Sequence, residues 1–581
     1  MSNQTKGLTR RQILTGAGAA VTSAGVISLT GCESVATYNW HHETDILVVG
    51  SGVGAASAAL TAHGNGNAVM LIEKAGFFGG TSNKSAGVLW IPNNFTLKER
   101  GIEDRRDDCV RYQARFSYPE RFNADDANLG ITEHELSLLE AFYDNASDAV
   151  DALRASSSLN VGEWRMFALD RPATDYLDHV PENKTPAGRA LGPLREDGSM
   201  GGGGDLMAQL GAAIERQNIP ALANHRAVKL IQDEDGQVIG VQADNNGETV
   251  NFKANKAVIF ATGGYAHNRE MTDKLQPMRL YGSCAMPAAE GDFINIATSA
   301  GAQLGNIGGA WRTQILLENA LASPLLGQGV FFPPGDSALQ VNKYGVRAVN
   351  ENRNYNDRTE AHGLFDSSRA EYPNQLMFMI YDQRTAEAFA GAYPLPAEPD
   401  AAPYVLSGQT LEELAAAIRD RLGEISASTG GLELDASFAD NLRKTIAKFN
   451  GFAVYGEDED FQRGKNAYDS EWHQVFSPMA AGTDWPKNPY PSITMHPLQD
   501  EGPYYAIMLA AGALDTCGGP VIDAGARVLD GYGNPIPNLY GAGNCIASPS
   551  GDAYYGAGHT LGMSMTFGYI AANAASEDSA S

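Results

Sequence analysis

A glycine-rich turn near the start of the chain is the pattern with the clearest chemical meaning. Residues 45–50 read as a buried strand, and GSGVGA at residues 50–55 leads from it into an alanine-rich helix. Gly50 permits a tight turn, Gly52 lets the backbone approach a pyrophosphate, and Ala55 allows close helix–strand packing. The helix N-terminus supplies amide donors. A second strand, residues 69–72, ends at Glu73, which suits a ribose diol. Together these features predict a bound dinucleotide cofactor.

Two further glycine-rich strand ends lie far along the chain. Residues 257–264 read AVIFATGG and follow a strand meander with turns at residues 235–236 and 246–247. Residues 538–544 read NLYGAGN. In addition, residues 79–87 (GGTSNKSAG) combine small residues with hydroxyl groups that can wrap a flattened cofactor and hydrogen-bond its phosphates. Three separated strand ends of this kind fit one extended ligand.

These motifs resemble those of the FAD-binding family that includes fumarate reductases, succinate dehydrogenase flavoproteins and 3-ketosteroid dehydrogenases, over residues 44–575. The resemblance implies an α/β fold with a Rossmann-like FAD-binding domain, split in sequence, and an inserted α+β substrate or capping domain. The implied FAD-binding parts are residues 44–277 and 499–575, and the substrate domain is residues 278–498. We expect the small polar residues 576–581 to form a disordered tail.

FAD is therefore the expected cofactor. Part of this family bonds its flavin to a His near the glycine-rich segment, but no His lies between His63 and His134 here, so we expect non-covalent FAD. The residues assigned to FAD binding are Gly50, Gly52, Gly54, Ala55, Glu73, Gly80, Thr81, Ser82, Ser85, Gly87, Ala261, Thr262, Gly263, Gly543, Asn544, Thr560 and Leu561.

The resemblance also assigns catalytic residues. Fumarate reductases carry a proton-delivering Arg four positions after the Glu of segment 349–355 (VNENRNY). Here that position is Tyr355, which resembles the base of ketosteroid Δ1-dehydrogenases. Segment 552–562 (DAYYGAGHTLG) resembles the one whose Tyr hydroxyl and Gly amide hold the steroid ketone, and implies Tyr554 and Gly558. A second Tyr of the family, which hydrogen-bonds the base, aligns with His179.

The reaction implied is 3-oxosteroid Δ1-dehydrogenation, or the same desaturation of a related cyclic ketone. Tyr554 and Gly558 would polarise the C3 carbonyl, Tyr355 would take the C2 proton, and the C1 hydride would pass to flavin N5. A free tyrosine titrates near ~10, so Tyr355 needs help to act as a base. The alternatives are a reductase of an α,β-unsaturated compound, a Δ4-(5α) steroid dehydrogenase, and an electron-transfer subunit in which Tyr355 only packs.

The composition of the chain excludes some classes of binding partner and cofactor. The 581-residue chain has a formal net charge of −27, which disfavours nucleic acid. None of its five cysteines is arranged as C-x-x-C, so we expect neither a metal site nor an attached c-type haem. The expected substrate is a small apolar ketone, and the expected electron acceptor is a quinone or a redox protein.

The first residues predict export. Residues 9–14 (TRRQIL) resemble a twin-arginine signal, and residues 29–32 (LTGC) resemble a lipobox, so residues 1–32 form the expected signal. In this interpretation the protein lies in the periplasm or cell envelope and touches the membrane only through lipid on Cys32. The alternative is cleavage of the signal without lipidation.

Overall fold

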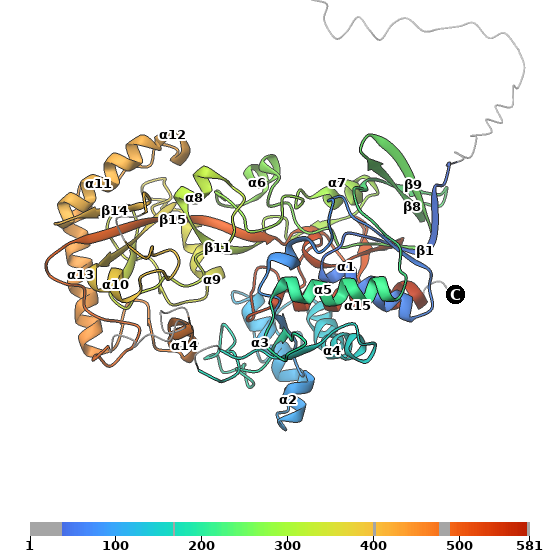
Figure 1. The fold of residues 1–581 in the computed structure, drawn as a ribbon, viewed down its shortest axis with the longest axis horizontal. Coiled ribbons are helices and arrows are strands. Elements are labelled where there is room, and N and C mark those ends of the chain that lie inside the picture. Colours follow the sequence, from blue (N-terminus) through green and yellow to red (C-terminus); the bar gives the residue numbers. More distant parts are fainter. Residues whose placement is uncertain (1–37, 167–168, 399–401, 476–487, 578–581) are drawn as a thin grey trace, which may run out of the picture. The chain divides into compact units, whose positions relative to one another are not determined.

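Eight strands form the sheet that ends at the expected cofactor site (Figure 1). β1 (His42–Val49) pairs in parallel with β2 (Val69–Ile72) and β9 (Glu248–Phe260), and β18 (Pro535–Gly541) pairs in parallel with β9. Residues 46–49 of β1 are all buried, as is typical of a parallel sheet covered on both faces. The carboxyl ends of these four strands therefore meet at one edge, although β18 comes from the far end of the chain.

The computed structural model describes residues 38–166, 169–398, 402–475 and 488–577. The chain separates into two units, Met1–Asn39 and Trp40–Ser581, and every helix and strand of the described residues belongs to the second. The expected export signal and Cys32 lie outside the described residues. Within the described ranges, no helix combines the length and the apolar character that a membrane span requires.

Helix α1 (Val53–Gly64) packs tightly against α15 (His559–Glu577), and α5 (Gly203–Arg216) lies beside α1 (Figure 1). The hydroxyl of Ser57 donates to the carbonyl of Met565 at 2.8 Å. A Cβ placed on Gly568 would lie 2.2 Å from the carbonyl oxygen of Gly54. The first and last parts of the chain are therefore joined by backbone packed directly on backbone.

The predicted strand meander is confirmed. β7 (Arg226–Gln232) and β8 (Val238–Asn245) pair antiparallel, and β8 pairs antiparallel with β9. Gly236 and Gly247, the glycines of the two predicted turns, both have positive φ. This hairpin extends the sheet beyond β9.

A second sheet of five antiparallel strands is built around β15 (Tyr504–Thr516). Its partners are β11 (Ala310–Leu316), β13 (Leu376–Asp382) and β14 (Val405–Gly408), and β12 (Ala338–Val341) pairs with β13. Alternate residues face two different cores. Phe378 and Ile380 pack with α11 (Leu411–Glu424) and α13 (Phe438–Tyr455), whereas Met379 and Tyr381 pack with α10 (Gln383–Ala388).

Two helices on the side of this second sheet carry candidate side chains. α9 (Tyr355–Glu360) packs on β11, where the Asn356 side chain accepts a hydrogen bond from the Arg312 amide at 2.8 Å. α14 (Ala467–Val475) contributes Tyr468 and Trp472. The remaining elements are α2 (Phe95–Glu99), α3 (Arg106–Ser117), α4 (Glu133–Ala155), α6 (Arg269–Leu275), α7 (Asp292–Ser299), α8 (Leu317–Ala322), α12 (Ser426–Thr429), β3 (Leu89–Trp90), β4 (Val161–Glu163), β5 (Ala190–Pro193), β6 (Ala221–Leu222), β10 (Leu304–Gly305), β16 (Gly519–Pro520) and β17 (Arg527–Leu529).

The structure departs from the expected segmentation at two places. The expected second FAD-binding part, residues 499–575, begins with β15, which pairs over most of its length with β11 and β13. The expected disordered tail begins inside α15, because Ser576 and Glu577 are helical. The Ser576 hydroxyl donates to the carbonyl of Ala572 at 2.6 Å and accepts from the side chain of Asn67 at 2.9 Å, which holds this last turn in place. Residues 578–581 lie outside the described residues.

The contact between α1 and α15 predicts a matched pair of outcomes. Gly568→Ala would force a methyl group onto the carbonyl of Gly54, and we expect the free energy of unfolding to fall by ~1–3 kcal/mol. Gly211→Ala, in α5, meets nothing within 4 Å and should raise it by ~0.5–1 kcal/mol. Thermal unfolding of the two variants checks both signs. A melting temperature unchanged in Gly568→Ala would contradict the packing.

Candidate active site

The carboxyl ends of the parallel strands open into a cavity of about 750 Å³. Gly50 ends β1 with φ 113°, and a Cβ there would lie 2.3 Å from the carbonyl oxygen of Ala261. Only glycine lets the ends of β1 and β9 come this close. At the start of α1, the Ser82 hydroxyl accepts a hydrogen bond from the Val53 amide at 3.1 Å. The turn, the helix start and the segment 79–87 therefore form one wall of the cavity.

Glu73 directly follows β2, and two hydrogen bonds fix the orientation of its side chain. One carboxylate oxygen accepts from the Ser51 hydroxyl at 2.7 Å, and the other accepts from the Ala75 amide at 2.8 Å. The residue lines the cavity and is 9% exposed. Each oxygen keeps a lone pair for a further donor, such as a ribose hydroxyl.

Nearly all residues assigned to FAD binding line this one cavity. Ala55 does not, because it is fully buried inside α1, where its small side chain serves packing. The residues that line it are Gly50, Gly52, Gly54, Glu73, Gly80, Thr81, Ser82, Ser85, Gly87, Ala261, Thr262, Gly263, Gly543, Asn544, Thr560 and Leu561. Close backbone, hydroxyl groups and a terminal carboxylate fit the expected FAD.

Three buried tyrosines meet where the cavity leaves the cofactor edge. The hydroxyl of Tyr176 lies 3.1 Å from that of Tyr355. The ring of Tyr554 lies 5.4 Å from the ring of Tyr355 and is stacked on Tyr176, also at 5.4 Å. Tyr355 is the first residue of α9, whose N-terminus is capped by the Asn354 side chain accepting from the Asp357 amide at 2.9 Å. The helix start thus fixes where the Tyr355 ring enters the cavity.

Burial dominates the protonation of this cluster. It raises the pKa of Tyr355 and the pKa of Tyr176 well above the ordinary tyrosine value, and the neighbouring phenols raise the pKa of Tyr355 further. The Tyr554 pKa is raised by burial as well. A base in this cluster therefore requires a source of positive charge or hydrogen-bond donors that stabilises an ionised phenol.

Gly558 completes the site beside Tyr554. Its φ is 88°, and a Cβ would lie 2.4 Å from the carbonyl carbon of Val88, so both backbone and space require glycine. Its carbonyl accepts from the amide of Trp90 at 3.0 Å. Within the described part of the chain, no group accepts a hydrogen bond from its amide. That amide is therefore available to a ketone oxygen in the cavity.

His179 lies away from this cluster. Its side chain is 42% exposed, its Nδ1 atom lies 3.4 Å from an oxygen of Asp178, and it does not line the cavity. Tyr176, three residues earlier, occupies the place at the Tyr355 hydroxyl that the resemblance assigned to His179. Residues 169–188 contain no helix and no named strand that would fix an alignment, and the position that the resemblance assigned to His179 is displaced by three residues.

Aromatic side chains that the sequence analysis missed form the apolar walls. Trp472 stacks on Phe332 at 4.6 Å and on Trp164 at 5.7 Å, and Trp311 stands perpendicular to Tyr554 at 5.7 Å. They come from four segments far apart in the sequence, so no local pattern marks them. Their flat, apolar faces suit a ring-shaped ligand.

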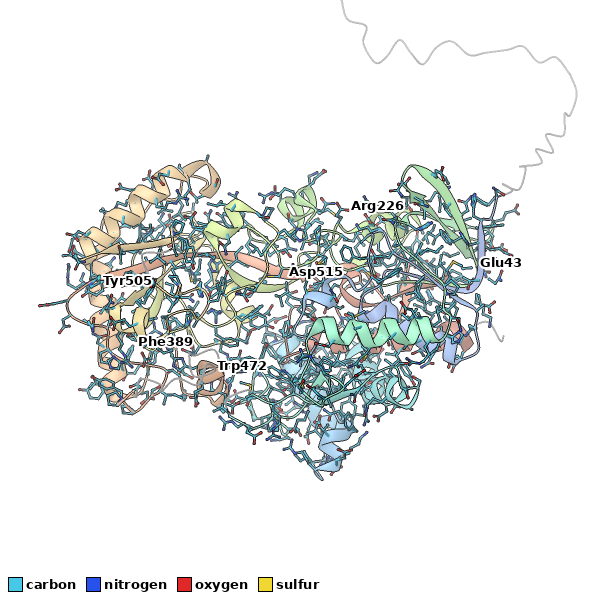
Figure 2. The ribbon with its side chains drawn as sticks, in the orientation of Figure 1. Glu43, Arg226, Phe389, Trp472, Tyr505 and Asp515 are labelled. Atoms are coloured by element: carbon cyan, nitrogen blue, oxygen red, sulfur yellow. The ribbon has the colours of Figure 1, made fainter. Side chains whose placement is uncertain are left out.

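Asp515, at the end of β15, joins these walls to the cofactor edge; Figure 2 labels it together with Trp472 of α14. Its carboxylate accepts from the amide of Gly264 at 2.9 Å and from the side chain of Asn544 at 3.1 Å. Asn544 in turn accepts from the indole of Trp311 at 3.0 Å. Burial raises the pKa of Asp515 above its ordinary value.

Comparison with known proteins identifies the family of the chain. A family model described as FAD binding domain matches residues 45–561. A 4-oxocyclohexanecarboxylate 2-dehydrogenase of Sinomonas cyclohexanicum is 33% identical, over 91% of this chain and 92% of its own. A 3-oxosteroid 1-dehydrogenase of Mycolicibacterium smegmatis is 27% identical, over 92% of this chain and 97% of its own.

Solved structures share the fold. The 3-ketosteroid delta1-dehydrogenase of Sterolibacterium denitrificans superposes with a TM-score of 0.74 at 25% identity, over 92% of this chain and 100% of that chain. An open flavocytochrome c3 fumarate reductase superposes with a TM-score of 0.61 at 23% identity, over 93% of this chain and 79% of that chain. The chain therefore belongs to the FAD binding domain family, and it is an FAD-dependent oxidoreductase that acts on CH–CH bonds.

Proposed function

We propose that the protein desaturates the carbon–carbon bond beside the ketone of a cyclic ketone, with a 3-oxosteroid, converted at C1–C2, as its substrate. The observation that carries the proposal is the meeting of Tyr176, Tyr355 and Tyr554 with Gly558 in an aromatic cavity that continues from the cofactor edge. The superposable Sterolibacterium enzyme, whose structure contains 1,4-androstadiene-3,17-dione, supports a steroid.

The residues divide the reaction between them. The Tyr554 hydroxyl and the Gly558 amide donate hydrogen bonds to the ketone oxygen, which makes the neighbouring C–H acidic. The Tyr355 oxygen accepts that proton, and Tyr176 hydrogen-bonds the same oxygen. The bound flavin supplies the acceptor for the hydride from the adjacent carbon. One proton and one hydride leave, and a double bond forms.

A second candidate substrate is a small ring ketone that carries a carboxylate. The 33% identity with a 4-oxocyclohexanecarboxylate 2-dehydrogenase favours it. Lys84 lines the cavity, and its ammonium donates to the carbonyl of Leu326 at 2.9 Å. Within the described residues Lys84 forms no ion pair with a carboxylate, so a substrate carboxylate has a cation available to it.

A substrate panel separates these candidates. We expect a 3-keto-4-ene steroid to bleach the flavin absorbance of the anaerobic holoenzyme and to yield a product two hydrogens lighter by mass spectrometry. Bleaching by 4-oxocyclohexanecarboxylate alone, weakened about tenfold or more in Lys84→Met, would select the second candidate. Reoxidation of pre-reduced flavin by unsaturated acids, without bleaching by any ketone, would contradict desaturation altogether.

Replacing the base tests the proposed reaction. Tyr355→Phe should slow anaerobic flavin reduction by the ketone about 10²–10⁴-fold, because the acceptor for the substrate proton is lost. Tyr455→Phe is the matched control, since Tyr455 is 84% exposed at the end of α13. The flavin spectrum should be the same in both variants. Turnover of Tyr355→Phe at the rate of the control would remove Tyr355 as the base.

A second pair of variants tests whether Tyr176, and not His179, supports Tyr355. Tyr176→Phe removes the hydrogen bond to Tyr355, and we expect flavin reduction to slow by about tenfold, the effect of ~1.4 kcal/mol. His179→Ala should reduce flavin at the wild-type rate because its side chain faces solvent. The reverse ranking of the two rates would restore His179 to the site.

A further inference from the structure

Arg358 is a buried cation whose hydrogen-bond partners are all neutral. It lies on α9, three residues after Tyr355, and is 2% exposed. Its Nε atom donates to the side-chain oxygen of Gln314 at 2.7 Å. Its two terminal nitrogens donate to four backbone carbonyls, those of Glu351, Arg353, Val330 and Phe331, at 3.1, 2.6, 2.8 and 3.1 Å. These bonds satisfy the guanidinium without compensating its charge.

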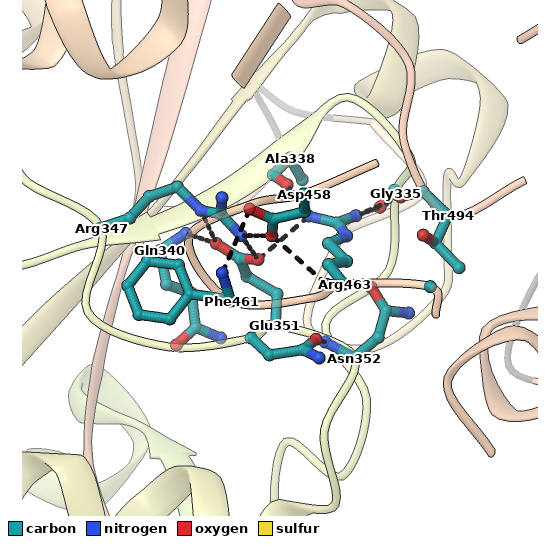
Figure 3. A network of polar contacts seen from close by, with 12 residues as sticks. Gly335, Ala338, Gln340, Arg347, Glu351, Asn352, Asp458, Phe461, Arg463 and Thr494 are labelled. Atoms are coloured by element: carbon teal, nitrogen blue, oxygen red, sulfur yellow. Dashed lines mark hydrogen bonds and ion pairs between the residues drawn. The ribbon is translucent and has the colours of Figure 1, made fainter. Parts of the chain in front are cut away.

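The neighbouring charges are already balanced without Arg358. Figure 3 shows the adjoining network, in which Arg347 bonds Glu351 and Asp458, and Arg463 bonds Glu351. Two guanidinium groups there meet two carboxylates. Glu351 touches Arg358 only through its backbone carbonyl. A buried charge that lacks a counter-ion is unfavourable, so its position calls for a negative group elsewhere.

Tyr468, on α14, packs on a segment that Arg358 bonds: its ring lies 6.3 Å from that of Phe332, and Arg358 donates to the carbonyl of the preceding Phe331. Its side chain is fully buried, and its hydroxyl has no hydrogen-bond partner within the described residues. Its ring lies 5.1 Å from that of Tyr176, and the guanidinium carbon of Arg353 lies 5.6 Å from its centroid. Burial raises the pKa of Tyr468 well above the ordinary tyrosine value and the Tyr355 phenol raises it further, while Arg353 and Arg358 lower it. The Tyr468 hydroxyl thus interacts electrostatically with both Tyr355 and Arg358.

Few other charged or titratable groups face this region. Burial lowers the pKa of Arg358 to about 10, so it remains a cation at neutral pH. Arg353 is already matched, because its Nη1 atom lies 3.5 Å from Asp469. Burial and Arg358 together hold the pKa of His362 near 4, so that ring stays neutral. The groups facing Tyr468 and Arg358 are Tyr176, Glu351, Arg353, Tyr355, His362 and Asp469.

We propose that Arg358 is a positioning residue whose charge stabilises an ionised phenol in the tyrosine cluster, with the Tyr468 hydroxyl as the group through which it acts on Tyr355. This inference rests on the proposed function, because only a base needs an ionised phenol. It accounts for the placement of an unmatched cation beside an unpartnered hydroxyl. It also supplies the positive charge that burial of Tyr355 requires.

The first test is the pH dependence of flavin reduction by the ketone, in the holoenzyme under anaerobic conditions. Removing the cation disfavours the ionised phenol, so the acid limb of the rate profile should move to higher pH by ~1–3 units in Arg358→Gln. Arg358→Lys keeps the charge and should move it less. Arg384→Gln, which removes a guanidinium paired with Asp336, should leave it in place. An unmoved limb in Arg358→Gln, or equal shifts in the Gln and Lys variants, would show that Arg358 only supports the loops.

The second test needs no substrate and so separates this inference from the proposed function. Ultraviolet difference spectra of the holoenzyme against Tyr468→Phe cancel the flavin absorbance and follow one tyrosine as pH rises. We expect that tyrosine to ionise at lower pH in the wild-type background than in Arg358→Lys, and lower there than in Arg358→Gln if that variant folds. Identical titration in the wild-type and variant backgrounds would overturn the inference. A panel in which no ketone bleaches the flavin, together with a shifted titration, would contradict the proposed function alone.

Discussion

The buried carboxylate of Asp515 holds the cofactor edge and the substrate walls in one geometry. It is 1% exposed, and a carboxylate so buried must be hydrogen-bonded to be tolerated. One oxygen accepts from the Thr516 amide, and the other accepts from the Gly264 amide, in the loop after β9, and from the Asn544 side chain, in the turn after β18. Because Asp515 lies at the end of β15, the central strand of the second sheet, a shift of the two sheets relative to each other would break its hydrogen bonds to Gly264 and Asn544.

The main energetic difficulty of the site is the ionisation of a buried tyrosine. Apolar walls that suit a ring ketone also raise the pKa of the tyrosine that must take the proton. The phenols of Tyr176 and Tyr554 raise the pKa of Tyr355 further, and in our proposal the unmatched guanidinium of Arg358 opposes this rise through Tyr468. The burial that suits the substrate therefore disfavours the ionised base, and in our proposal Arg358 on α9 and Tyr468 on α14 determine how far the base can ionise.

The cofactor half of the site could be predicted from sequence because its constraints are local. Gly50 is dictated by a positive φ and by the approach of Ala261, and such requirements leave a mark on the residue type itself. Tyr176 could not be found in this way, because its backbone is held by a hydrogen bond from its amide to the distant carbonyl of Tyr555. The aromatic walls depend likewise on packing between α14 and loops remote in sequence. Patterns of single residues do not report such long-range contacts.

Hydrogen exchange at the carbon beside the ketone tests the central claim, that Tyr355 removes this proton, most directly. With the flavin reduced beforehand, no hydride can leave, and the substrate can only exchange its acidic hydrogen with deuterated water. The account predicts deuterium incorporation at that carbon with the wild-type protein and its loss with Tyr355→Phe, both read by mass spectrometry of the recovered ketone. Equal incorporation by the two proteins would contradict the account.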